Sequence, residues 1–271
     1  NSDLAKRVLI APESVFTMFR EAEMNPVNHE LTEIERTKVE KAFAILTKTK
    51  SRLHFSGRTD TGVSASAQVA HIDLPCQHIE GLSKPQMFDL IWRLNGILPK
   101  DVAIAELVNV DKSFHARHSA REREYVYRIL NKPQRSALLK DTHLLVRQPL
   151  DLQIMQDAAA RLVGRHDFSA FRSTSDDISS PICTINRAEL LNLREGVLEF
   201  WIAADHFVYN MVRIIVGTLI DIGLGKRGAD AISQALLEPN RSLTGPTAPP
   251  WGLTLNAVRY PGFSLWSSGN N

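Results

Sequence analysis

Apolar side chains recur along this chain with two different periods, and the two periods predict its secondary structure. Spacing of i, i+3, i+4 and i+7, which places apolar residues on one face of a helix, occurs in four stretches. These are residues 33–48, 84–95, 151–163 and 208–222. Asp151 precedes the third stretch and is a good N-cap, while Gly96 and Gly223 end the second and fourth. A shorter helix is predicted over residues 14–23.

Short apolar or alternating runs between these helices predict strands. One begins at Leu53, and the others cover residues 8–11, 67–72, 102–110, 124–131, 142–147, 185–193, 197–203 and 252–260. Residues 185–193 and 197–203 form a hairpin around Arg194-Glu195-Gly196. Helices and strands therefore alternate irregularly, with hairpins in both halves. This order predicts the α+β class with mainly antiparallel sheet, not a βαβ winding.

The composition is that of an ordinary globular chain. Of 271 residues, 44% are hydrophobic and 23% charged, and no apolar run approaches the length of a membrane span. No signal peptide is evident. The two cysteines, Cys76 and Cys183, lie far apart without C-x-x-C spacing, which excludes a disulfide framework and a cysteine-based zinc site. We expect no metal and a reducing compartment, either cytoplasm or an organelle.

Positive charge is local, because the net charge is only +2. The segment 115–135 holds six cations against Glu122 and Glu124. The cations are Arg117, Arg121, Arg123, Arg128, Lys132 and Arg135. A charge run is usually a solvated face, but tyrosines are interleaved here, which favours contact with a polynucleotide.

A short loop bounded by Gly57 and Gly62 carries the candidate catalytic acid, Asp60, close to Arg58. A strand enters the loop and another leaves it, so the carboxylate is held yet open to a cleft. A plain turn with a surface ion pair is one alternative. An aspartic protease is another, since residues 60–62 spell D-T-G, but that chemistry needs two aspartates and hence a symmetric dimer.

Three further residues stand out: Tyr125 and Tyr127 in the basic segment, and Arg213 in the last predicted helix. Tyr125 and Tyr127 alternate on one strand face; such tyrosines are usually core, but one at a cleft edge can stack on an extruded base. Arg213 lies off the apolar stripe of its helix, where an unpartnered guanidinium would be costly. Its partner is either a structural acid or Asp60.

Four segments resemble, in order, the motifs of the tRNA pseudouridine synthase A (TruA) family. They are Gly57-Arg58-Thr59-Asp60-Thr61-Gly62-Val63 with Gln68, Val69 and His71; the R-x-Y-x-Y-x run 123–128; F-x-x-x-M-V-R in 207–213; and T-A-P-x-x-G-L-x-L in 247–255. Phe114-His115-Ala116-Arg117 and residues 164–168 also match. The resemblance covers roughly residues 35–260, and the protease alternative explains none of the later motifs.

The resemblance implies an enzyme that isomerises uridine to pseudouridine at positions 38 to 40 of the tRNA anticodon stem-loop, without a cofactor. It implies that Asp60 is catalytic, that Tyr125 stacks on the uracil and that Arg213 pairs with Asp60. Further substrate contacts are expected from Leu253, Tyr127, His71, Arg58, Arg117, Arg121 and Arg123. The expected partners are tRNA and, in a homodimer, a second copy of the chain, with no membrane.

For the fold, the resemblance implies two ferredoxin-like halves with a joined, mainly antiparallel central sheet, helices on one face and a cleft between the halves. With the boundary near Pro149, we expect a catalytic subdomain over 35–149, a second subdomain over 150–262 and a tail over 263–271. Residues 1–34 show neither the family's first strand nor its loop ending in G-W-Q. A tRNA-binding or tRNA-folding protein of impaired activity is therefore the alternative function.

Overall fold

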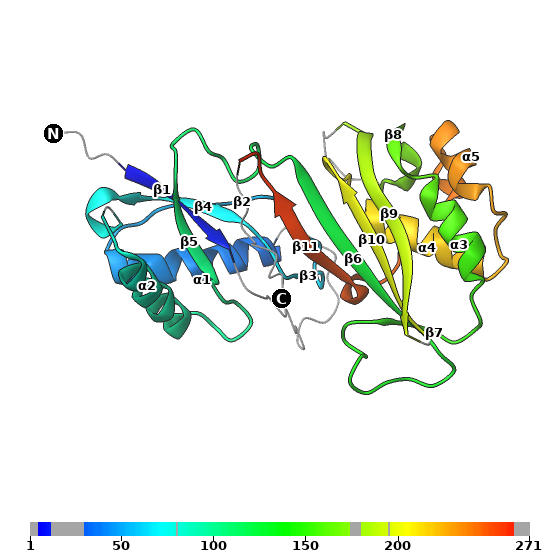
Figure 1. The fold of residues 1–271 in the computed structure, drawn as a ribbon, viewed down its shortest axis with the longest axis horizontal. Helices are drawn as coiled ribbons and strands as arrows, with labels where there is room; N and C mark the ends of the chain where they lie inside the picture. The colour runs from blue at the N-terminus through cyan, green and yellow to red at the C-terminus, as the bar shows by residue number, and fades with distance from the viewer. Residues whose placement is uncertain (1–4, 12–29, 80, 174–179, 195, 263–271) are drawn as a thin grey trace. The chain divides into compact units, whose positions relative to one another are not determined.

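The computed structural model describes residues 5–11, 30–79, 81–173, 180–194 and 196–262 (Figure 1). The predicted helix over 14–23 lies outside the described residues. The chain divides into two compact units. The first contains residues 1–121 and 255–271, and the second contains residues 122–254.

The first unit is built on a four-stranded antiparallel sheet in the order β2-β4-β1-β5. The strands are β1 (Ala5–Ala11), β2 (Leu53–Phe55), β4 (Ala70–Pro75) and β5 (Glu106–Val110). β1 pairs with β4 from Ala5↔Pro75 to Ile10↔Ala70 and with β5 on its other edge. β1 contains the strand predicted over residues 8–11 and occupies a central place in this sheet, where the sequence pattern left the family's first strand unrecognised.

In the described part of the first unit, two helices pack on the sheet, α1 (Glu30–Thr47) and α2 (Lys84–Ile97). Phe43 of α1 and Leu94 of α2 are buried in the core, and the α2 stripe of Met87, Leu90 and Ile91 packs partly buried against it. α2 begins at a capping box, in which the Ser83 amide donates to Oε1 of Gln86 at 2.9 Å. The helical periods predicted for both elements are confirmed.

The segments that follow β5 and end the chain complete the first unit. The Arg121 amide donates to the carbonyl oxygen of Arg259 at 2.8 Å, at the end of β11 (Leu253–Arg259). Next to β3 (Ser64–Ala65), the Ser66 amide donates to the Leu255 carbonyl at 2.9 Å. The Tyr260 hydroxyl donates to the Ala116 carbonyl at 2.7 Å. Residues 255–260 are thus tied to the first unit although they lie far from its other residues in the sequence.

The sheet of the second unit runs in the order β6-β10-β9-β8, with antiparallel neighbours, and β7 runs parallel to β6. The strands are β6 (Glu122–Asn131), β7 (Leu144–Val146), β8 (Gly164–Asp167), β9 (Ile182–Arg194) and β10 (Val197–Ala204). β6 pairs with β10 from Val197↔Leu130 to Ala204↔Arg123. This ladder places β6 in the second unit, so the division falls at residues 121/122, whereas the sequence pattern places it near Pro149.

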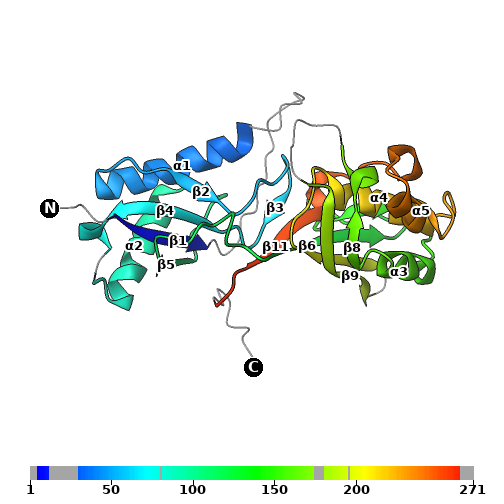
Figure 2. The ribbon, with the colours of Figure 1, turned by 90° about the horizontal axis from the view of Figure 1, so that it is seen from above.

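The described residues of the second unit form three α-helices, and Figure 2 views them from above the ribbon of Figure 1. They are α3 (Leu152–Ala160), α4 (Met211–Gly223) and α5 (Ala231–Leu237). The Asp151 side chain caps α3 by accepting from the Ile154 amide at 3.1 Å, as predicted. The core of the unit includes Tyr127, Phe168, Phe171 and Phe200, all without exposed surface. The predicted α+β class with mainly antiparallel sheet is confirmed.

The short elements β3, β8 and α5 were not predicted from the sequence, nor were the 3-10 turns η1 (Cys76–His78), η2 (Ser169–Phe171), η3 (Arg241–Leu243) and η4 (Pro250–Gly252). None of the helices in the described part of the chain combines the length and the apolar character that crossing a membrane requires.

Candidate active site

The Asp60 loop leaves β2 and returns to β4, and hydrogen bonds close it at its base. The Ser56 amide donates to the Val69 carbonyl at 2.7 Å. The Gln68 side chain accepts from the Ser56 hydroxyl at 2.6 Å and donates to the Gly57 carbonyl at 3.2 Å. Gln68, which the motif contains, therefore fastens both arms of the loop to each other. The predicted arrangement of an acid between two paired strands is confirmed.

A tight turn sets the backbone at Asp60. The Val63 amide donates to the Asp60 carbonyl at 3.0 Å, and Gly62 has φ +82° at the third position of this turn. Residues other than glycine rarely adopt that conformation, which explains the glycine that bounds the loop. Asp60 is half-buried and Arg58 is exposed, while Val63 is 5% exposed. The hydrogen-bonded turn thus holds the half-buried Asp60 side chain on a backbone of fixed conformation.

His71, expected among the substrate contacts, lies in the core of the first unit and is only 1% exposed. Its Nδ1 accepts from the Ala116 amide at 3.0 Å, and its ring stacks on His54 with centroids 4.9 Å apart. The side chain can therefore not reach RNA directly, and the expectation of contact is corrected. His71 instead ties β4 to the Phe114-His115-Ala116-Arg117 segment.

His54, His71 and His115 bring ring nitrogens within 4.8 Å of one another, the spacing of a possible metal site. However, Nδ1 of His71 and Nδ1 of His115 accept backbone amides, from Ala116 and from Arg117 at 3.1 Å. A neutral ring that accepts at Nδ1 carries its proton on Nε2. In His71 and His115, therefore, the Nδ1 lone pair is used by the amide and Nε2 is protonated, so neither ring nitrogen can bind a metal. Histidines that bind metals use the reverse pattern and donate from the other nitrogen. This donor set does not fit a metal.

The members of the basic segment have different surroundings. In the first unit, Arg117 and Arg121 are exposed. In the second, Arg123 donates from Nη1 to the Asp205 carbonyl at 2.7 Å. Arg128 pairs with Glu199 at 3.0 Å and donates to the Thr254 hydroxyl at 3.1 Å. Arg128 is thus a structural cation within its sheet.

The two candidate tyrosines of β6 differ sharply in exposure. Tyr125 is half-buried, and its ring meets Phe207 edge-to-face at 5.2 Å. Tyr127 has no exposed surface, and its hydroxyl donates to the Pro249 carbonyl at 2.9 Å. Burial raises the pKa of Tyr127, against the opposing positive charge of Arg213. The expected contact of Tyr127 with substrate is therefore corrected, because its side chain is part of the core.

Arg213 lies in the first turn of α4 and is held by acceptors from two segments. Its Nε donates to the Ala248 carbonyl at 2.7 Å, and its Nη1 donates to Oδ1 of Asn210 at 2.8 Å. Asn210, the residue before the helix, has φ +61°. These two bonds fix the plane of the guanidinium, since it donates along defined directions.

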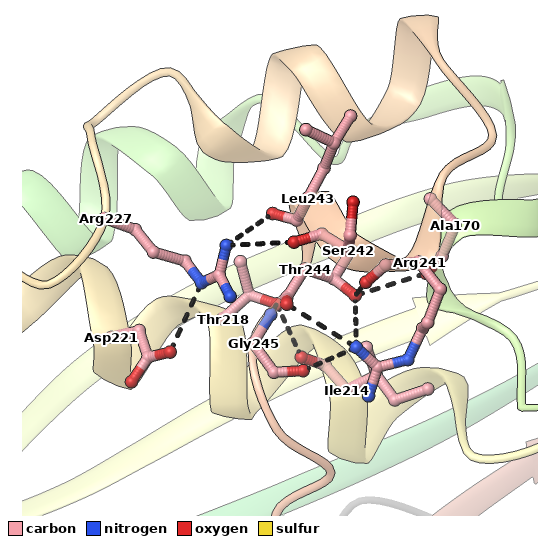
Figure 3. Close-up of polar contacts among 10 residues, drawn as sticks. All are labelled: Ala170, Ile214, Thr218, Asp221, Arg227, Arg241, Ser242, Leu243, Thr244 and Gly245. Atoms are coloured by element: carbon pink, nitrogen blue, oxygen red, sulfur yellow. Dashed lines mark hydrogen bonds and ion pairs between the residues drawn. The ribbon is translucent and has the colours of Figure 1, made fainter.

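The segment that supplies Ala248 is itself locked onto α4 (Figure 3). Arg241 donates from Nη1 to the Thr244 hydroxyl at 2.7 Å and to the Gly245 carbonyl at 2.8 Å. The Gly245 amide donates to the Thr218 hydroxyl at 2.8 Å. At Gly217 a Cβ would lie 1.7 Å from the carbonyl oxygen of Pro246, so only glycine allows this approach. We name residues 241–249 the Arg213-supporting loop.

Arg227 holds the start of the Arg213-supporting loop. It pairs through Nε with Asp221 at 3.2 Å and donates from Nη1 to the Leu243 carbonyl at 3.1 Å. Sequence reasoning missed Arg227 and Arg241, although cations that follow a strongly apolar helix offered a weak signal.

Leu253 begins β11 directly after η4 and is 5% exposed.

A second cluster, formed by Cys183, His206 and Asp205, has the order of a nucleophile–base–acid set. Cys183 Sγ lies 3.4 Å from His206 Nε2, and His206 Nδ1 lies 2.9 Å from Asp205 Oδ1. Burial, followed by the nearby carboxylates of Asp205 and Asp167, raises the pKa of Cys183 to about 12. The buried thiol therefore stays protonated near neutral pH and is not a nucleophile.

Comparisons with known proteins agree with the motifs. A family model described as tRNA pseudouridine synthase matches residues 158–261. A tRNA pseudouridine synthase A of Geobacillus sp. (strain WCH70) is 40% identical over 211 residues, which cover 77% of this chain and 81% of the relative. Those of Halalkalibacterium halodurans and Acetivibrio thermocellus are 43% identical over 203 residues (74% of each chain) and 41% identical over 222 residues (82% and 88%).

The matched model and the antiparallel α+β units define a protein of the pseudouridine synthase class. Sequence identity of 40% and 41% over most of both chains assigns the chain to a particular family within this class. The chain belongs to the tRNA pseudouridine synthase A family.

Proposed function

We propose that this protein isomerises uridine to pseudouridine in tRNA, at positions 38 to 40 of the anticodon stem-loop. The observation that carries the proposal is the 40% identity to a tRNA pseudouridine synthase A over 81% of that relative. The clasped loop that presents Asp60 between β2 and β4 supports it. Nothing in the described residues favours the alternative of an inactive tRNA-binding protein.

The reaction breaks the bond between N1 of uracil and C1′ of ribose and forms a bond between C5 and C1′. Cleavage builds oxocarbenium-like positive charge on the sugar, as in glycoside hydrolysis. We assign Asp60 the role of the carboxylate that stabilises or attacks C1′, or that removes the 2′ proton. The proton lost from C5 balances the proton gained at N1. No group is transferred from outside, so the proposal includes no cofactor.

Tyr125, Arg213 and Leu253 complete the proposed site. Tyr125 has a half-buried ring on β6 that can stack on the detached uracil, while Leu253 would pack beside it. Arg213 is proposed to orient the Asp60 carboxylate through charge-assisted hydrogen bonds. Its fixed plane, held by Ala248 and Asn210, supports that role.

Access to the target requires that uridine leave its stack, so base flipping is part of the proposal. Arg58, Arg117 and Arg121, which are exposed, and the half-buried Arg123 are proposed to contact the phosphates. We further propose a homodimer located in the cytoplasm or an organelle. Light scattering at the concentrations used for catalysis measures the oligomeric state.

The decisive experiment incubates the purified chain with an unmodified tRNA transcript and maps pseudouridine by carbodiimide labelling and primer extension. Product confined to positions 38–40 is expected, and none with Asp60→Asn. Binding of tRNA by this variant, followed by filter retention, serves as its folding control. Wild-type chain that binds tRNA but forms no product at stoichiometric concentration would replace the proposal with the tRNA-binding alternative.

A further inference from the structure

A pocket of about 380 Å³ lies in the second unit, at the end of the sheet where β6 continues into residues 132–139. Its lining residues are Leu130, Lys132, Gln134, Arg135, Ser136, Leu139, Arg194 and Val197. All of them belong to the second unit. None of them is among the residues assigned to the proposed active site.

The sheet ladder builds the floor of this pocket. Val197 pairs with Leu130 of β6 on one side and with Arg194 of β9 on the other. Leu130 and Val197 are buried, at 5% and 7% exposure, whereas Arg194 is exposed. One row across three strands therefore gives an apolar base with a cation at its edge.

The turn between β9 and β10 positions Lys132. Gly196 has φ +73°, and its carbonyl accepts from the Asn131 amide at 2.7 Å. A Cβ at Gly196 would lie 2.6 Å from Cγ of Lys132, so the lysine stem packs directly on the glycine. The ammonium group is thus carried on a supported stem.

The polar groups of the pocket are suited to an anion. Lys132, Arg135 and Arg194 are cations, Gln134 and Ser136 are neutral hydrogen-bonding residues, and no acidic residue is among the described residues that line it. One of these cations, Arg194, also makes a small contribution to the pKa of His143. Burial first, and then the positive charges of Arg128 and Arg194, lower the pKa of His143, with Glu199 opposing.

We propose that this pocket binds a backbone phosphate of the tRNA substrate outside the target nucleotide, an inference that rests on the proposed function. Tyr125 and Leu130 are five residues apart on β6, or about 17 Å along the strand. A phosphate in the pocket therefore belongs to a different nucleotide from the uracil at Tyr125. The apolar floor accommodates the adjoining ribose, and the cations neutralise the phosphodiester.

The test compares two triple variants that remove the same charge. Lys132→Gln/Arg135→Gln/Arg194→Gln empties the pocket of cations. Lys140→Gln/Arg147→Gln/Lys226→Gln removes three exposed cations of the same unit that do not line it. Binding of fluorescent full-length tRNA is measured by anisotropy between 50 and 300 mM KCl. Thermal unfolding and light scattering check the fold and the oligomeric state.

The pocket variant is expected to bind tRNA about tenfold or more weakly than the control variant. Its slope of log Kd against log salt should also fall, by about 0.9 for each phosphate that the protein no longer neutralises. Turnover at saturating tRNA should be maintained, because the pocket does not touch the reacting uridine. Equal Kd values and equal salt slopes for the two variants overturn the inference.

Two further outcomes would also overturn it. Inorganic phosphate or uridine monophosphate binds the wild type in one of these outcomes. If loss of Lys132 abolishes that binding but leaves the affinity for tRNA unchanged, the pocket serves a small phosphorylated ligand. If only the oligomeric state changes, the pocket is a protein interface. Because anisotropy requires no product, pocket-dependent tRNA binding without pseudouridine formation would refute the proposed function alone.

Discussion

Arg213 and Ala248 exchange two hydrogen bonds. The guanidinium Nε donates to the Ala248 carbonyl at 2.7 Å, and the Ala248 amide donates to the Arg213 carbonyl at 3.0 Å. The first turn of α4 and the Arg213-supporting loop are therefore joined at both the side chain and the backbone. The orientation of the arginine depends on a segment that begins 28 residues later, at Arg241.

Replacement of Arg213 by lysine should lower kcat/KM by about 10- to 100-fold, the cost of losing charge-assisted hydrogen bonds worth about 1.5–3 kcal/mol. An ammonium keeps the charge but cannot donate in the guanidinium plane to both Ala248 and Asn210. Single-turnover kinetics on an anticodon stem-loop measure the effect. Arg165→Lys, at an exposed position, is the control. Near-normal turnover of Arg213→Lys would reject the orienting role.

Gly217→Ala should destabilise the second unit by about 1–3 kcal/mol and reduce turnover, because the added methyl meets the Pro246 carbonyl and displaces the Arg213-supporting loop. Gly96→Ala is a matched control: it also lies in a helix, but nothing is within 4 Å of its Cβ. Calorimetry should show an unchanged or slightly raised melting temperature for the control. Equal melting behaviour of the two variants would contradict the close approach.

The two tyrosines of β6 should differ in their effect on catalysis. Tyr127→Phe removes the bond to the Pro249 carbonyl and should cost about 0.5–1.5 kcal/mol of unfolding free energy with turnover retained. Tyr125→Ala should lower stability by losing the contact with Phe207, and it should also lose about 1–3 kcal/mol of stacking on the base, seen as a drop in kcat/KM. Denaturant titration and single-turnover assays measure the two quantities. Loss of turnover in Tyr127→Phe together with normal turnover in Tyr125→Ala would contradict these roles.

Cys183 should react slowly with thiol reagents in the native protein. Its pKa is raised to about 12, whereas an unfolded cysteine ionises near pH 8.5. The contribution of the neutral thiol to the free energy of unfolding is therefore fully present below about pH 8.5, and it is lost as the pH rises toward 12. Alkylation is followed by mass spectrometry in a Cys76→Ser background, with and without denaturant. Fast alkylation of the folded protein at pH 7 would contradict the raised pKa.

The long periodic helices could be predicted from sequence because their burial pattern is local, as the stripe of α2 shows. β8 could not, because Gly164, Arg165, His166 and Asp167 carry no apolar alternation and become a strand only by pairing with β9. In β1 the charged Lys6 and Arg7 hid the first half of a strand that β4 and β5 fix from both sides. The seven-residue α5 is too short for a helical period to stand out.

The candidate site was predictable where a residue type is unusual in its setting, as with Asp60 in its glycine-bounded loop and Arg213 off an apolar stripe. The partners of Arg213 were not, because a backbone carbonyl such as that of Ala248 has no signature in the sequence. Alternation put Tyr125 and Tyr127 on one face but could not show which one the Pro249 segment covers. The same limit applies to His71, whose burial follows from packing against Ala116.

The hydrogen bonds among Ser56, Gln68 and Gly57 hold the base of the Asp60 loop, apart from the residues at its tip. Hydrogen bonds at this base join the segment before the acid to the segment after it, and none of them involves a residue of the tip. Residues at the tip, such as Thr59 and Thr61, can then be exchanged in a library while the stem is held constant. Selection on such a library would explore new reactions at a nucleoside without first having to rescue folding.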